Sequence, residues 1–142
     1  MTPNSLSWLM NDFRDRTEGV EHALLFSRDG LKLHWDDGLD PDPEADPVVR
    51  DRVEYLAAIG SGIAGLAAEA SDKLDCGGSP DYITLLFPER QLLLVNAGHG
   101  AVLTALAAAD AEPGLVGAEM VRLIDRLSEH LGIAPRQSGA PS

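Results

Sequence analysis

Three short apolar segments, separated only by tight turns, lie within residues 82–107 and constrain the fold more than any other feature. The three predicted strands are residues 82–87, 91–97 and 101–107. Connections this short leave no room for a crossover, so neighbouring strands must pair antiparallel. The middle segment is apolar without interruption from Leu92 to Val95, which is typical of a strand that is covered on both faces.

A hairpin is predicted upstream of these strands. An Asp-Gly pair joins residues 20–27 to residues 31–35, and such a pair between two apolar runs is a strong hairpin signal because both turn positions need positive φ. The return strand alternates in character, so we expect one face to be buried and the other exposed. The expected buried residues are Leu31, Leu33 and Trp35, and the expected exposed ones are Lys32 and His34. The hairpin brings the predicted sheet to five strands.

Three further segments have the periodicity of amphipathic helices. The first places apolar residues from Leu6 to Phe13 on one face, the second spans residues 51–74, and the third begins after Pro113 and stops at Gly132. The order is helix, two strands, long helix, three strands, helix. It predicts an α+β fold in which a five-stranded antiparallel sheet is covered by a long central helix and two terminal helices.

The long helix carries two different stripes of residues. Its large apolar residues, with some alanines, share one face, which we expect to lie on the core: Leu56, Ile59, Ile63, Leu66, Ala67, Ala70 and Leu74. A second flank is lined by the small residues Ala57, Ser61, Ala64 and Ala68. Because small side chains allow another helix to approach closely, we predict that this second flank is the interface of a homodimer.

Residues 36–50 differ in composition from the rest of the chain, since aspartate and glutamate alternate there with proline. Prolines remove backbone donors and the acids repel one another, so an exposed insert is predicted. The aspartate spacing of a calcium-binding loop is absent, and no metal site is predicted. The length of the chain indicates one domain. We expect this domain to span residues 1–132, insert included, and a flexible tail to span residues 133–142.

The glycines from Gly60 to Gly65 match the pattern G-x-G-x-x-G. That pattern binds a dinucleotide only where a strand ends at the first glycine, whereas here it falls inside the predicted long helix. Ser61 lacks the flanking glycine of a nucleophile elbow, and neither the single Cys76 nor the scattered histidines have the spacing of a ligand or catalytic set. We therefore expect no cofactor and no enzymatic activity.

Charge excludes two classes of partner. The chain of 142 residues has 23 acidic and 11 basic residues and a formal net charge of −12. Nucleic acids and anionic lipids are bound by clusters of lysine and arginine, which the sequence lacks. No apolar run approaches the ~18 residues of a spanning helix, and the first residues do not resemble a secretory signal. We expect a cytoplasmic protein whose partner offers a basic surface.

The order of the elements and several short strings resemble the roadblock/dynein light-chain family. The resemblance is greatest to bacterial members that are encoded beside Ras-like GTPases. These strings are residues 19–23, 27–31, 56–66, 98–103 and 114–120. The resemblance spans roughly Leu6 to Leu131, and the order and spacing of the strings carry it rather than any catalytic signature.

The resemblance implies a homodimer whose sheets join edge to edge while the long helices pack together. It also implies a non-catalytic regulator of a small Ras-like GTPase, acting as an activator, a scaffold or a subunit of a membrane-associated signalling complex. The residues themselves leave one alternative open. A sheet covered by helices can hold a pocket between the two layers, so a small-molecule sensor is the second hypothesis.

Overall fold

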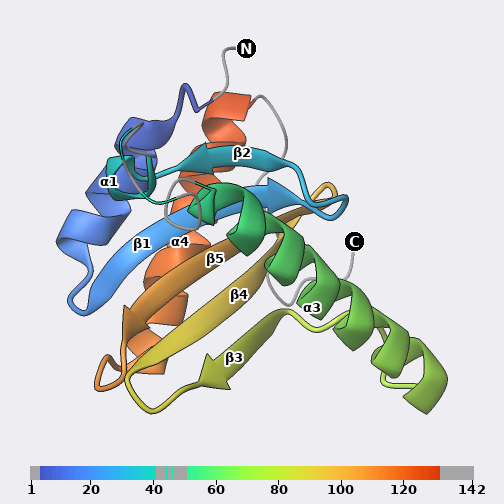
Figure 1. The fold of residues 1–142 in the computed structure, drawn as a ribbon. Helices are drawn as coiled ribbons and strands as arrows, with labels where there is room; N and C mark the ends of the chain where they lie inside the picture. Colours follow the sequence, from blue (N-terminus) through green and yellow to red (C-terminus); the bar gives the residue numbers. More distant parts are fainter. Residues whose placement is uncertain (1–3, 41–43, 45, 47–50, 132–142) are drawn as a thin grey trace.

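The computed structural model describes residues 4–40, 44, 46 and 51–131. In chain order the elements are α1 (Ser7–Arg16), β1 (Val20–Ser27), β2 (Lys32–Trp35), the 3-10 helix η1 (Asp37–Leu39), α3 (Arg52–Leu74), β3 (Tyr82–Leu86), β4 (Arg90–Gly98), β5 (Ala101–Ala108) and α4 (Pro113–Leu131). The five strands form one antiparallel sheet in the order β2-β1-β5-β4-β3. Helices α1 and α4 cover one face and α3 crosses the other, which confirms the predicted fold class (Figure 1).

Buried apolar side chains form one cluster on each face of the sheet. The larger cluster lies under α1 and α4, and the smaller one lies under α3. The predicted inward faces of both terminal helices are confirmed. Their buried residues include Leu9, Met10 and Phe13 of α1 and Val116, Met120, Leu123, Ile124 and Leu127 of α4. The predicted central strand is β4, which is buried on both faces from Leu92 to Val95.

The alternation predicted for β2 is wrong at two residues, because Leu31 is exposed and His34 is buried. The strand contains a β-bulge: His34 pairs with Leu25 and Lys32 pairs with Phe26, so one residue of β2 has no partner between them. The bulge turns His34 towards α1, where its Nδ1 accepts a hydrogen bond from the backbone N–H of the residue that caps this helix. Burial lowers the pKa of His34, so the neutral ring that this bond requires is favoured.

Asp36 was expected to begin the exposed insert, but its side chain is completely buried. One carboxylate oxygen accepts the backbone N–H of Ala23 at 2.8 Å. The other contacts the guanidinium of Arg14 at 3.0 Å, the ring of His22 at 3.1 Å and the backbone N–H of Gly38 at 3.1 Å. Asp36 therefore joins α1, β1 and η1, and the leucine that ends η1 is buried as well.

Most of the remaining insert, namely residues 41–43, 45 and 47–50, lies outside the described residues, as do residue 132 and the predicted tail at 133–142. Glu44 and Asp46 are exposed, in agreement with the prediction for this part of the chain. The correction therefore concerns the start of the insert: Asp36, which caps η1, and η1 itself belong to the folded domain.

The long helix α3 is present where it was predicted, but it turns a different face to the sheet. Val53, Ala57 and Gly60 are buried, whereas Ile59 and Leu66 of the predicted core face are 57% and 72% exposed. The prediction is therefore correct in part: Leu56 and Ile63 of the predicted stripe pack against the cluster under α3, and the rest of the contact comes from Val53 and the small residues.

Gly60 explains this orientation. A Cβ atom at Gly60 would lie 2.5 Å from the Cζ of Phe26, so the phenyl ring of β1 occupies the space that any other side chain would take. The backbone of α3 can approach the sheet this closely only because the contact residue is glycine. As predicted, the G-x-G-x-x-G pattern lies inside the helix.

This contact predicts opposite effects for two glycines of α3. We expect Gly60→Ala to lower the free energy of unfolding, because overpacking costs about 1–3 kcal/mol and outweighs the gain of up to ~1 kcal/mol in helix propensity. Gly65→Ala should raise it by about 0.5–1 kcal/mol, since a Cβ there meets nothing within 4 Å. Urea denaturation measures both. The packing argument is wrong if the two variants change stability alike.

The contacts of Asp36 predict how stability depends on pH. Burial alone would raise the pKa of Asp36, but the hydrogen bonds from His22, from the backbone of Ala23 and from Arg14 outweigh it and hold this pKa below the ordinary value of 3.8. A carboxyl group of this kind stabilises the fold above its ordinary pKa, and the contribution is lost as the pH falls through the folded pKa.

We therefore expect Asp36→Asn to lower the free energy of unfolding by about 1–3 kcal/mol at pH 7. As the pH falls below 3.8 the difference from the wild type should shrink progressively, because the carboxyl of the unfolded wild-type chain is protonated first and that of the folded chain follows at lower pH. Denaturation at pH 7 and through this acid range tests this. An equal loss at every pH would show that shape, rather than charge, makes Asp36 important.

Candidate interaction surface

The four small residues predicted to face a second copy lie towards the chain's own sheet. Ala57 is 0% exposed, and the hydroxyl of Ser61 donates a hydrogen bond to the carbonyl oxygen of Arg28 at 2.6 Å. Ala64 packs against the cluster under α3, and Ala68 is half-buried beside the loop that follows the helix. Ala57 is therefore wrong as an interface residue, because its side chain has no surface left for a partner.

The opposite side of α3 carries the exposed apolar residues instead. We define the outer face of α3 as Tyr55, Ile59, Gly62 and Leu66, which follow one another at intervals of four, three and four residues. The three large side chains are among the most exposed apolar groups of the described chain. A Cβ at Gly62 would meet nothing within 4 Å, so the backbone is accessible at the middle of this face. Exposed apolar stripes of this kind mark interaction sites.

Strand β3 forms one edge of the sheet, and none of the described strands pairs with its outer side. The carbonyl oxygen of Asp81 accepts the N–H of Asn96, and the N–H of Phe87 donates to the carbonyl oxygen of Arg90. Asp81 and Phe87 thus point their backbone groups towards β4. Along an antiparallel strand, residues point their N–H and C=O groups alternately to one neighbour and to the other. The outward-pointing residues are Tyr82, Thr84 and Leu86. This edge can therefore accept another strand.

The outer face of α3 and the β3 edge lie on neighbouring parts of the molecule. Helix α3 runs diagonally over the sheet, from the β1 and β2 side towards β3 (Figure 1). Ala64 of α3 and Ile83 of β3 line the same small cavity, so the two elements approach each other there. One partner can therefore cover both surfaces.

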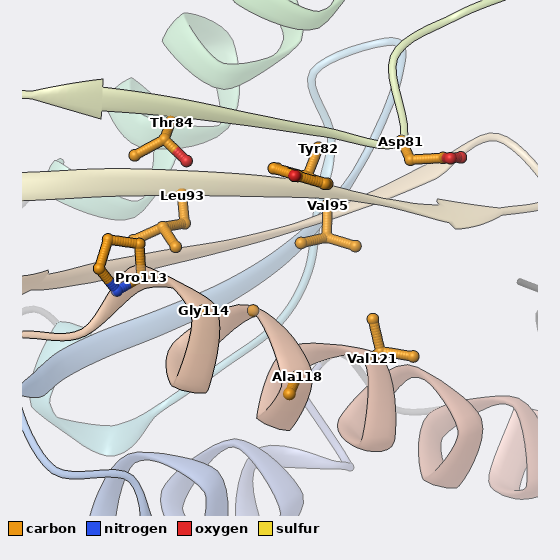
Figure 2. Close-up of a pocket in the computed structure, with 10 residues that line it drawn as sticks. Asp81, Tyr82, Thr84, Leu93, Val95, Pro113, Gly114, Ala118 and Val121 are labelled. Carbon is orange, nitrogen blue, oxygen red and sulfur yellow. The ribbon is translucent and has the colours of Figure 1, made fainter.

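A groove of about 370 Å³ lies on the other face of the sheet, between α4 and β3, and we call it the α4–β3 groove. Its lining residues are Asp81, Tyr82, Thr84, Leu93, Val95, Pro113, Gly114, Gly117, Ala118 and Val121. Figure 2 shows side chains of β3 and β4 on one side and those of α4 on the other. The groove exists because α4 presents small residues here, and a Cβ at Gly117 would meet nothing within 4 Å.

Two large apolar side chains of β3 belong to the same face of the sheet as this groove. Tyr82 pairs with Val95 and Leu86 pairs with Gln91, and the side chains of such pairs share a face. Val95 is buried under α4, so Tyr82 and Leu86 also point to the α4 side. They are 71% and 75% exposed.

Chemistry-bearing side chains do not converge anywhere in the described ranges in the way a metal centre requires. No group of three or more histidine, cysteine, aspartate or glutamate residues there has the arrangement of a metal site. His99 sits at φ +53° in the turn between β4 and β5, and Cys76 is exposed. None of the helices in the described part of the chain is long and apolar enough to cross a membrane.

Comparisons with known proteins agree with this architecture. The family model of the Roadblock/LC7 domain matches residues 6–107. A Roadblock/LC7 domain from Streptomyces avermitilis is 27% identical, with a TM-score of 0.75, and the alignment covers 89% of this chain and 97% of that one. A search of curated proteins gives no match.

Two further solved structures show similarity of fold alone. MglB from Myxococcus xanthus is 13% identical with a TM-score of 0.71, and the alignment covers 89% of this chain and 94% of that one. The gliding protein MglB from Thermus thermophilus is 21% identical with a TM-score of 0.70, and the alignment covers 91% of this chain and 90% of that one.

Proposed function

The chain belongs to the Roadblock/LC7 family, and from this premise we propose that it is a non-catalytic, homodimeric regulator of a small Ras-like GTPase in the cytoplasm. It acts as an activator or as a scaffold that assembles a signalling complex. The observation that carries the proposal is the exposed outer face of α3 beside the edge of β3, which no strand of the described residues covers. Both surfaces suit protein partners, and the resemblance to bacterial roadblock proteins encoded beside Ras-like GTPases supports the identity of the regulated protein.

In the proposed dimer, the β3 strands of two copies pair antiparallel about a two-fold axis. Full overlap of this five-residue strand places Thr84 opposite its own copy and Tyr82 opposite Leu86. All three residues point their backbone groups to the free side, so each pair can form both hydrogen bonds. The two sheets become continuous, and both α3 helices come to lie on the same face of the joined sheet. Such an interface is isologous, because each copy uses the same surface.

The net charge of −12 favours a GTPase with a basic surface, because opposite potentials accelerate encounter. A regulator that works by binding can reorganise the residues of its partner without contributing a catalytic side chain. The site therefore needs apolar contact area and complementary charge rather than a nucleophile or a metal.

The dimer predicts the effect of a charge on the outer face of α3. Ile59→Arg should give a monomer with an intact fold, because Ile59 is exposed in the isolated chain and a charge there would be buried in the proposed interface. Light scattering after size exclusion measures the mass, and circular dichroism checks the fold. Asp72→Arg is the matched control, since it puts the same side chain on an exposed flank of α3. If Ile59→Arg keeps the dimer mass, α3 is not at the interface.

The regulated partner is tested by affinity capture. The tagged chain should retain a Ras-like GTPase from an extract of its source cells, identified by mass spectrometry in samples loaded with GTP analogue or GDP. Preference for one nucleotide state would identify an activator or effector, and capture in both states would identify a scaffold. The amount of GTPase retained by the Ile59→Arg variant, compared with the wild type, measures whether capture requires the dimer. If no GTPase is retained in either state, the proposed function is wrong.

The α4–β3 groove favours a second candidate function, that of a small-molecule sensor. Its volume of about 370 Å³ falls within the range of ~300–1,000 Å³ that is usual for ligand pockets, and most of its lining is apolar. A ligand that binds only the folded chain raises its melting temperature. A thermal-shift screen of apolar metabolites would therefore detect it.

A further inference from the structure

We propose that the α4–β3 groove of each copy receives the Leu86 side chain of its partner. This inference rests on the proposed homodimer and adds a second set of contacts to it, on the face of the sheet opposite α3. The groove is then part of the dimer interface, and each copy completes the other.

The groove is an unfilled space that the described residues of one copy do not close. Its floor is the apolar surface of β3 and β4, including Leu93 and Val95, and its wall is the stripe Gly114, Gly117 and Ala118 of α4. A Cβ on Gly117 would meet no atom within 4 Å. Packed interiors rarely leave an apolar space of this size empty, so an apolar group from outside is the appropriate occupant.

Leu86 has the complementary property, since it is a large apolar side chain with little of its own chain to contact. It is 75% exposed and points to the α4 side, as its pairing with Gln91 requires. It ends β3, whereas the groove is lined from Asp81 to Thr84, the first part and the middle of that strand. Within one copy, Leu86 therefore lies beyond the lining of the groove, towards the other end of the strand.

Antiparallel pairing brings the opposite ends of two β3 strands together. With Thr84 on the two-fold axis, the partner's Leu86 stands directly opposite Tyr82, at a Cβ separation of ~4.5–5.5 Å, and on the same face of the joined sheet. Tyr82 lines the groove. The partner's Leu86 thus lies at the mouth of the groove, and the symmetry repeats this contact on the other side. In any shifted register, at least one of Tyr82, Thr84 and Leu86 has no outward-pointing residue opposite it in the partner strand.

The test fills the groove and removes the leucine, separately and together, in the full chain. Gly117→Leu places a side chain in the groove, and Leu86→Ala removes the inserted one. Each should raise the dimer dissociation constant by about ten-fold or more in analytical ultracentrifugation, with an unchanged fold. In the double variant the leucine at position 117 takes the place of the lost Leu86 side chain. The fold-increase in the dissociation constant of this variant should therefore be well below the product of the fold-increases of the two single variants.

Leu31→Ala is the matched control, because Leu31 is 65% exposed at the opposite edge of the sheet. It should leave the dissociation constant unchanged. A wild-type chain that is monomeric at every concentration would overturn the proposed dimer and this inference with it. A wild-type dimer that tolerates Gly117→Leu, or single effects that simply multiply in the double variant, would overturn only the insertion of Leu86.

Discussion

The contact between Gly60 and Phe26 decides which side of α3 faces solvent, and the outer surface of the domain depends on it. The phenyl ring fills the position of a missing Cβ, so the helix is held to the sheet through its small residues. Tyr55, Ile59 and Leu66 of the same helix are then turned outwards. A surface suited to a partner is thus produced by how the helix packs inside the domain, and the loss of helix propensity at this glycine is offset by closer contact with β1.

The elements and their order could be predicted from the sequence because each depends on local signals. Turn residues, apolar alternation and helical spacing identified the sheet, α1 and the inward face of α4. The orientation of α3 could not be found in the same way, since its sequence has two stripes and periodicity does not tell which one meets the sheet. That choice depends on the ring of Phe26, which is 34 residues away from Gly60. The bulge in β2 and the burial of Asp36 depend likewise on contacts with α1 and β1.

The two edges of the sheet differ in a way that favours one of them for pairing. The edge at β2 is a strand of four residues with a bulge and an exposed lysine, all of which discourage the addition of another strand. The edge at β3 has a regular register and exposes tyrosine and leucine. In the proposed dimer only the β3 edge is used, so two paired copies would form a closed assembly rather than a growing fibre.

The burial of Asp36 also affects which changes the acidic segment after it can tolerate. Its carboxylate fixes the point at which the acidic segment leaves the sheet, and that point lies beside β2, at the far end from β3. Doubling the length of a loop costs only ~0.6 kcal/mol in closure entropy when its ends are already held. A change in the length of this segment should therefore cost the fold little free energy and leave the β3 edge unaffected.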